Sequence, residues 1–305
     1  MSKRATGIVS TALLTVLLAQ GLLFALLTTA PGDAVDLMSP SSAARPALEE
    51  ALGLQGSAGQ RLLRHLGNLA TGDLGMSVGV APGRSVGSLI AGPVASSAAL
   101  GLVALFLTIA AAWLAVVFDG RRVAAVRLVA LLPAFLLAHI LVGSTNAAVW
   151  WGVQADWWSR PAWFALPDVD HSLRDALAIA LLAAASGMWA EASDDVSTAW
   201  QTFGSAPFVE AARARRESIR GMAIHHMGLA TIELAARRVP WLLGSLLVVE
   251  RVLLIPGAGA LTWKAAELRD VPVVLALGLA AATATALATA LASGARAAID
   301  PRLGP

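Results

Sequence analysis

The chain has 305 residues, 57% of them hydrophobic and 14% charged, with a mean hydropathy of +0.70, which is too apolar for an ordinary water-soluble protein. It contains no cysteine, so disulfides and thiolate metal sites are excluded. Its net charge of +2 arises from arginines scattered among apolar segments, and this scatter argues against binding to nucleic acid. The composition therefore predicts an integral membrane protein.

Six segments are apolar enough to be membrane-spanning helices, because the hydrocarbon core of a bilayer needs about 20 residues of helix. The first follows Lys3 and Arg4 and is longer than the apolar core of a cleaved signal peptide. The third contains Pro133, which neighbouring helices accommodate in a membrane bundle, and the fifth is interrupted by Glu250 and Arg251. In chain order, the segments lie at 8–30, between 84 and 119, from 127 onward, 176–190, 239–255 and 271–294. We therefore expect an all-α integral membrane protein with about six transmembrane helices.

The distribution of Lys and Arg orients these helices. If the N-terminus lies inside, 13 basic residues fall on the inner side and eight on the outer side, four of them in a long loop to which the positive-inside rule gives little weight. We therefore expect both termini to be cytoplasmic. Five tryptophans then cluster at the outer interface, at positions 150, 151, 157, 158 and 163. Anchoring in the interface is the simplest interpretation, and stacking on a ligand is the alternative.

Three regions follow from this topology: a first transmembrane helix over residues 1–30, an extracytoplasmic loop over 31–93 and a transmembrane core over 94–305. In the loop, Ser57 and Gln60 form a capping-box pattern, and leucines then recur at helical spacing. We therefore expect the loop to contain short helices that lie on the outer face of the membrane.

A second long loop, over residues 191–238, faces the inside in this topology. Pro207 favours the start of a helix, and the good helix formers that follow predict a short one. Its alanines leave a narrow face flanked by arginines, which suits docking in a groove of another protein. The same residues also fit an ordinary helix in solvent or on the membrane surface.

The inner loop reads FVEAARARRES at 208–218, and further stretches accompany it in order along the chain. They are PGD at 31–33, LGLQ at 52–55, RHLGNLATGDLGMSV at 64–78, LLPAFLLA at 131–138, FALPD at 164–168, GSLLVVERVLLIPGAGALTWKAAELRDVPVV at 244–274 and IDPRLG at 299–304. Together they resemble the dipeptide/oligopeptide/nickel permease family of ABC importers, and specifically its member with a long first outer loop. The resemblance covers nearly the whole chain.

This resemblance implies a multi-pass permease subunit with a type I ABC-importer core in a bacterial cytoplasmic membrane. Its partners would be a second related permease, two cytoplasmic ATPase subunits and an extracytoplasmic solute-binding protein, and its cargo peptides or a small solute such as a nickel chelate. We expect no enzyme activity and no cofactor in this chain. It has no G-x-x-x-x-G-K-[ST] loop, and its only lysines are Lys3 and Lys264, so ATP must be used by partner subunits.

The resemblance also implies two groups of functional residues, with no catalytic residue and no metal ligand among them. The ATPase-coupling loop, over about 205–235, would use Phe208, Val209, Glu210, Ala211, Ala212, Ala214, Arg216 and His226. The pathway or its outer gate would use Glu250, Arg251, Pro256, Gly257 and Gly259.

Among these gate candidates, Glu250 and Arg251 are neighbours in sequence and point about 100° apart on a helix, so they cannot pair face to face. They serve either helix contacts or the pathway. Gly257 and Gly259 are most simply residues of a turn.

The coupling loop departs from the family pattern. Arg216 stands where the family has glycine, and Ala230 and Leu234 stand where it usually has asparagine and proline. Because glycine permits a turn that arginine resists, we expect a changed loop shape or a changed grip on the ATPase. The chain would then be the weaker coupling half of an asymmetric pair, or a permease-like subunit with impaired coupling.

Two other functions compete with this interpretation. An ion-coupled secondary transporter would use a buried carboxylate, but such proteins are typically built from repeated halves, and the sequence has no convincing internal repeat. A membrane-embedded enzyme would need a motif such as H-E-x-x-H, whereas His225 and His226 are adjacent and lack a nearby acid.

Overall fold

The structure is a computed structural model that describes residues 3–30, 32, 35–36, 44–51, 55–117, 132–156, 171–184 and 188–299. These residues are predominantly helical, and the extended pairing among them is an isolated antiparallel bridge between Met76 and Ser85. The expected all-α class is therefore confirmed for the part of the chain that is described. Trp157, Trp158, Trp163, the FALPD segment at 164–168 and residues 300–304 of the tail lie outside it.

The chain divides into two compact units. Unit 1 comprises Met1–Ser10, Ala98–Ile255 and Leu287–Pro305, and unit 2 comprises Thr11–Ser97 and Pro256–Ala286. Three long helices have residues in both units: α1 (Lys3–Thr29), α5 (Val86–Val117) and α13 (Val271–Ile299).

Unit 2 also holds α3 (Arg45–Ala51), α4 (Ala58–Ala70) and α12 (Ala258–Glu267). Helix α4 begins with the expected capping box, in which the Ser57 side chain accepts from the Gln60 amide and the Gln60 side chain accepts from the Ser57 amide. The core of the unit is formed by Val86, Ile90, Ala265, Val273, Val274, Ala276 and Leu277. Small and branched side chains in this cluster let α5, α12 and α13 approach closely.

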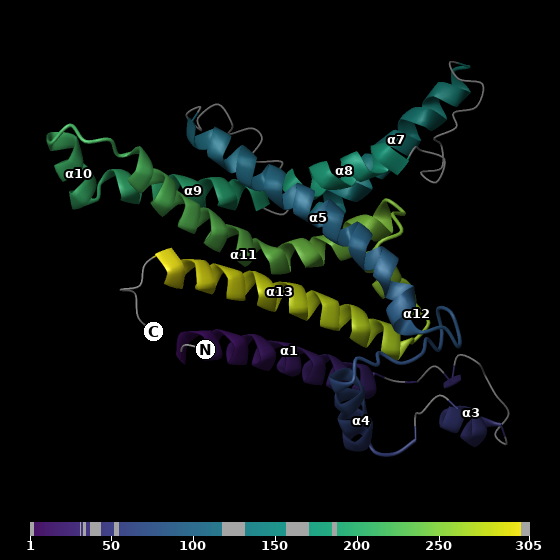
Figure 1. The fold of residues 1–305 in the computed structure, drawn as a ribbon. Coiled ribbons are helices and arrows are strands. Elements are labelled where there is room, and N and C mark those ends of the chain that lie inside the picture. Colours follow the sequence, from purple (N-terminus) through teal and green to yellow (C-terminus); the bar gives the residue numbers. More distant parts are fainter. Residues whose placement is uncertain are drawn as a thin grey trace. The chain divides into compact units, whose positions relative to one another are not determined.

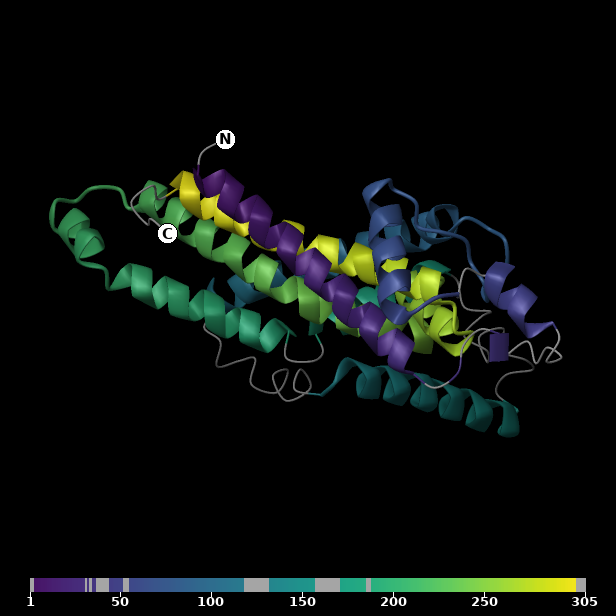
Figure 2. The same ribbon diagram turned by 90° about the horizontal axis from the view of Figure 1, so that it is seen from below.

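Unit 1 contains five further helices: α7 (Ala134–Gln154), α8 (His171–Ala184), α9 (Met188–Gly204), α10 (Pro207–Ala214) and α11 (Arg220–Val252). Helix α11 contacts α7, α8 and α9, so it is the central element of the unit. Figures 1 and 2 show α10 at the turn that joins α9 to α11.

Four helical stretches are long and apolar enough to cross a membrane: Thr6–Thr29, Val86–Ala115, Ala134–Gln154 and Val271–Ala298. The pair Arg174–Ala183 and Met188–Gly204, bent by 46°, brings the number to five if it forms one broken span. The described helices are thus consistent with a multi-pass membrane protein, and the expected number of six stays a prediction.

The expected fifth span, at 239–255, is the C-terminal half of α11 and is not among these stretches. Charged pairs at both ends of this segment, Arg237 with Arg238 and Glu250 with Arg251, keep it shorter than a full apolar span. The expected inner loop at 191–238 is also mostly helical, since it comprises nearly all of α9, the whole of α10 and the first half of α11.

Two prolines differ from the sequence-based expectation: one lies inside a helix instead of in the loop before it, and the other lies before a helix instead of inside it. Helix α5 begins at Val86 and contains Pro93, which had been placed at the end of the outer loop. Pro133 precedes α7 as its N-cap residue and is not inside that helix. Both differences have one cause: charge-free sequence on each side of a proline does not show on which side the helix begins.

Candidate functional site

The residues at the two ends of the short helix α10 favour its formation. Pro207 occupies its first turn, where the missing N–H has no helical partner to lose. Glu210 lies in the first turn and Arg213 in the last, so both charges complement the helix dipole. The expected short helix is therefore present between Pro207 and Ala214.

The two faces of α10 differ in burial. Val209 and Ala212 are almost fully buried. Val209 belongs to a cluster that includes Phe203, Met227 and Leu234 from α9 and α11. The other face carries Phe208, which is 51% exposed, together with exposed Glu210, Arg213 and Ala214, while Ala211 is half-buried at its edge. The expected coupling residues thus separate into a buried anchor and an outward surface.

Phe203 connects α10 to α11 through its ring. Its centroid lies 6.1 Å from that of Phe208 in an edge-on arrangement and 5.4 Å from that of His226. Such aromatic contacts favour one orientation of the short helix on its support. His226, which the resemblance assigns to the coupling loop, therefore lies against Phe203 of α9, the same ring that contacts Phe208 of α10.

The C-terminus of α10 shows the backbone conformation that Arg216 adopts. The backbone of Arg216 is left-handed, with φ of 56°. Its N–H donates to the Arg213 carbonyl at 3.0 Å, and the Glu217 N–H donates to the Ala212 carbonyl at 2.9 Å. These two bonds form a Schellman motif, the ending that glycine usually makes. Arg216 therefore ends α10 in the left-handed conformation that glycine usually takes, at a local steric cost.

An ion cluster joins α9 to α11. Arg238 is buried and donates to Glu191 and, at 2.9 Å, to Asp195. Glu191 and Asp195 are four residues apart on α9, so they face the same side and one guanidinium reaches both. The adjacent Arg237 approaches Asp195 less closely, at 3.4 Å, and its side chain is 64% exposed. This cluster fixes the two helices that carry α10.

The expected gate residues are divided between the units. In unit 1, Glu250 is fully buried, whereas Arg251 is exposed, as expected for neighbours that point in different directions. In unit 2, Gly257 is the N-cap of α12 and Gly259 lies inside that helix. The prediction that both glycines are turn residues was therefore wrong for Gly259, which is helical and buried.

Asp270 is a buried carboxylate that the sequence did not single out. Its Oδ2 accepts from the Ser77 hydroxyl at 2.5 Å. Three consecutive backbone N–H groups also donate to Oδ2, those of Val78 at 3.2 Å, Gly79 at 2.9 Å and Val80 at 2.9 Å. Asp270 also directly precedes α13, and its Oδ1 accepts from the Val273 N–H at 3.5 Å. The sequence signal for this position was present, because an aspartate before an apolar helix with an early proline is a typical N-cap. No sequence signal indicated that residues 77–80, which are distant in the chain, would donate hydrogen bonds to it.

Residues 32 and 36, which follow α1, also contact the short connector between α12 and α13 that contains Asp270. Arg269 Nη1 lies 3.8 Å from Asp36 Oδ2. Gly32 has φ of +78°, and a Cβ there would collide with the Arg269 guanidinium. The connector between α12 and α13 therefore holds the outer loop of unit 2 at two points, through Arg269 and Asp270.

No protein-family profile matches the chain, and no curated protein matches it. In the described part of the chain, no three His, Asp or Glu side chains lie together as a metal site would require.

Proposed function

We propose that the chain is a permease subunit of an ATP-driven importer and that α10 is its contact with a cytoplasmic ATPase. The observation that carries this proposal is a short helix at the end of a two-helix support, anchored by buried Val209 and Ala212, with the half-exposed ring of Phe208 at its surface beside Phe203. An exposed aromatic side chain among arginines is typical of a residue that anchors a protein contact.

The proposed assembly has a second, related permease, two ATPase subunits that use ATP, and a solute-binding protein on the outer side. The cargo is a peptide or a small solute such as a nickel chelate. Both termini of the chain are cytoplasmic in this proposal, and the membrane is the bacterial cytoplasmic membrane. The motifs quoted above support this assignment, because they occur in the family order along nearly the whole chain.

The retained turn at Arg216 supports a working contact over an impaired one. A Schellman motif closes the helix at the same residue where glycine would close it, so the outward surface of α10 keeps its boundary. The change to arginine adds a positive charge to that surface and need not change the path of the backbone.

A co-purification experiment tests the proposal. The tagged chain would be expressed with the products of neighbouring genes, and the ATPase retained in detergent would be quantified. We expect Phe208→Ala with Glu210→Lys to remove the ATPase, because both side chains are on the outward surface. The matched control is Leu63→Ala with Glu50→Lys, two exposed residues of the outer loop. Failure of the unaltered chain to retain any ATPase would refute the importer assignment.

A further inference from the structure

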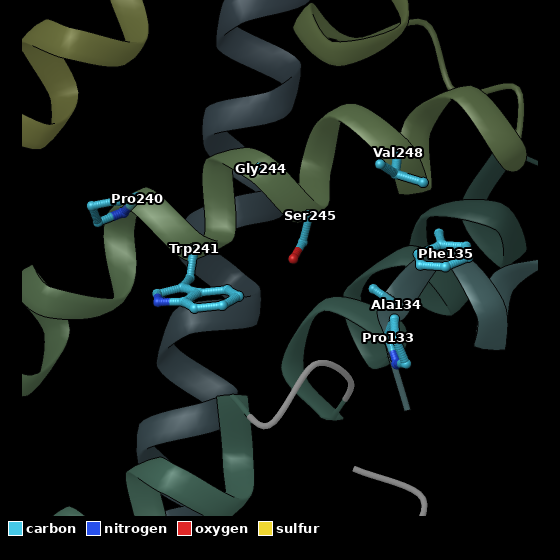
Figure 3. A pocket seen from close by; sticks show the side chains of 8 residues that line it. All are labelled: Pro133, Ala134, Phe135, Pro240, Trp241, Gly244, Ser245 and Val248. Carbon is cyan, nitrogen blue, oxygen red and sulfur yellow. The ribbon is translucent and has the colours of Figure 1, made fainter. Parts of the chain in front are cut away.

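Two places among the described residues differ in how closely they define what they can hold. One is an apolar groove of about 370 Å³ between α7 and α11 of unit 1, where Figure 3 shows Trp241 and Ser245 extending from α11 and Phe135 from α7. Trp241 and Ser245 are the only lining side chains with a hydrogen-bonding group, so the groove does not distinguish one apolar occupant from another. The other is a polar loop of unit 2 in which four donors meet at one oxygen atom.

The polar loop comprises residues 75–86 and is closed by its own backbone. The Ser77 N–H donates to the Arg84 carbonyl at 2.9 Å, and the Val86 N–H donates to the Gly75 carbonyl at 3.0 Å. The N–H groups of residues 78, 79 and 80 lie between these pairs in sequence and are directed to a common acceptor. Consecutive backbone N–H groups that converge in this way form a binding site for an anion.

The acceptor at this site is the carboxylate of Asp270. Its Oδ2 accepts from the Ser77 hydroxyl at 2.5 Å and from the N–H groups of residues 78–80 at 3.2, 2.9 and 2.9 Å. The Ser77 oxygen itself accepts from the Ala81 N–H at 2.9 Å, so its hydrogen is left to be donated to Asp270. Four donors on one oxygen match a charged carboxylate better than a neutral amide, because charge-assisted hydrogen bonds are about twice as strong as neutral ones.

Close contact at this site depends on glycine at position 79. A Cβ at Gly79 would lie 2.6 Å from the Leu268 carbonyl oxygen, a backbone atom that cannot rotate away. The contact is also shielded from water, because Asp270 is 0% and Ser77 2% exposed. A buried donor without an acceptor costs about 1–3 kcal/mol, so the loop strongly requires an oxygen atom at this place.

The charge of Asp270 is balanced by N–H groups. Within the described part of the chain no ion pair includes Asp270, and the neighbouring Arg269 lies 3.8 Å from Asp36. Asp270 directly precedes α13, whose first N–H groups also favour a negative charge, and its Oδ1 accepts from the Val273 N–H at 3.5 Å. Recognition at this site therefore needs a carboxylate alone, without a particular side-chain cation.

We infer that residues 77–80 are a binding site for a carboxylate group, here called the carboxylate site, and that Asp270 fills it as a tethered ligand. The loop precedes α5 and Asp270 precedes α13, so the occupied site joins the starts of two helices that are long enough to cross a membrane. A free carboxylate of matching size should therefore restore the contact once the side chain of Asp270 is shortened. The carboxylate site is independent of the proposed transport function.

Chemical rescue tests this site, with hydrogen exchange at residues 77–81 of the detergent-purified chain as the readout. Asp270→Ala leaves room for formate, and Asp270→Gly leaves room for acetate, whose methyl group replaces the missing Cβ. We expect exchange to be about tenfold faster in both variants, because the donors lose their acceptor. The matching anion, at about 0.1 M, should restore slow exchange; it has to replace a tethered group whose effective concentration is millimolar or above.

Size and charge provide the controls. Formate should act better than acetate on Asp270→Ala, because acetate carries one methyl group too many for the space. Acetamide, which has the shape of acetate without the charge, should restore neither variant, and sodium chloride accounts for ionic strength. The unaltered chain should not respond to acetate, because its site is filled. Asp73→Ala is the matched control, since Asp73 Oδ1 accepts from the Gly75 amide in an exposed turn and no added anion should restore that contact.

Any of three results with the shortened variants would overturn the carboxylate site. They are equal protection by acetate and acetamide, equal protection by acetate and chloride, and no protection of either variant by its matching anion. Asp270→Asn covers the case in which the shortened variants do not fold, because it keeps the size and shape of the side chain. Wild-type exchange at residues 77–81 in Asp270→Asn would show that the charge is not recognised, and it would overturn the proposal as well.

Discussion

Four of the described helices end on a left-handed residue that is not glycine. One of these residues is Asp156, which follows α7 with φ of 54°; in the other three cases the next residue is also described. Arg216, Leu254 and Arg269 follow α10, α11 and α12, with φ angles of 56°, 56° and 51°. In each case the next residue donates its N–H to a carbonyl five positions earlier, at 2.9, 2.9 and 2.8 Å. The hydrogen bonds of these endings are therefore complete, and the side chain adds a local steric cost.

Arg216→Gly should raise the free energy of unfolding by about 1 kcal/mol, because glycine adopts this conformation without the Cβ penalty. Thermal unfolding in detergent would measure the change. Arg213→Gly, one turn earlier inside α10, should instead lower stability by about 1 kcal/mol, since glycine is unfavourable in a helix. Equal destabilisation by both variants would show that the left-handed turn at Arg216 is not populated.

Asp270 is the second residue whose surroundings make a definite prediction. Asp270→Asn should destabilise the segment around residues 77–81 by roughly 1–3 kcal/mol, because the four donors around Oδ2 lose their charged acceptor in a buried site. Hydrogen exchange at residues 77–81 would report the loss as faster exchange. The control is Asp73→Asn, whose Oδ1 accepts from the Gly75 amide at 2.8 Å in an exposed turn. Unchanged exchange in Asp270→Asn would show that the hydrogen bonds to Asp270 Oδ2 do not stabilise residues 77–81.

At the scale of elements, α4 is held to α1 by a polar contact. His65 Nε2 lies 3.1 Å from Gln20 Oε1, and Gln20 Nε2 donates to the Leu275 carbonyl at 3.3 Å. The His65 ring also stacks on Phe24, with a centroid distance of 6.1 Å. Because the Gln20 amide already donates to α13, its oxygen accepts from His65.

This contact should weaken in acid. Burial lowers the pKa of His65 below its ordinary value of 6.5, so the docked helix binds fewer protons than the undocked one. The contribution of His65 to docking is complete above pH 6.5 and is lost as the pH falls from 6.5 through the lowered pKa. Hydrogen exchange in α4, corrected for the intrinsic rate at each pH, should therefore show more opening at pH 5 than at pH 7.5. His65→Gln should remove this difference, and its persistence there would assign the effect to another group.

The joint between α9 and α11 is an element-scale feature as well. Arg238→Gln should destabilise the two-helix support by roughly 1–3 kcal/mol, because Glu191 and Asp195 lose the one guanidinium that bridges them. Arg237→Gln is the comparison, and its effect should be close to zero because that side chain is mostly exposed. Thermal unfolding of both variants decides the point. Equal losses would mean that the cluster acts through charge alone.

At the scale of the whole molecule, topology is the property that the proposed function needs. Leu63→Cys on α4 and Arg215→Cys beside α10 each introduce one thiol into a cysteine-free chain, both at exposed positions. A membrane-impermeant maleimide should label Leu63→Cys in intact cells and Arg215→Cys only after permeabilisation. Labelling of Arg215→Cys in intact cells would reverse the proposed orientation and exclude a cytoplasmic ATPase contact at α10.

The candidate site was predictable in its local parts. Pro207 with the helix formers after it located α10, and Ser57 with Gln60 located the start of α4, because such signals act within a few residues. The division of α10 into buried Val209 and exposed Phe208 was not predictable, since it depends on Phe203, Met227 and Leu234 in other helices. The pairing of Asp270 with Ser77 was missed for the same reason, because 193 residues separate them.

The sequence by itself determined that this chain is helical, highly apolar and rich in stretches that can cross a membrane, since those properties follow from composition and local periodicity. It also placed the capping box and the short helix at 207–214. Only the tertiary structure decided that residues 239–252 belong to one long helix, that Arg216 adopts a glycine-like turn, and that Arg238 joins α9 to α11. The long helix and the role of Arg238 depend on contacts between residues that are distant in sequence. The conformation of Arg216 depends on the backbone angles at the end of a complete helix.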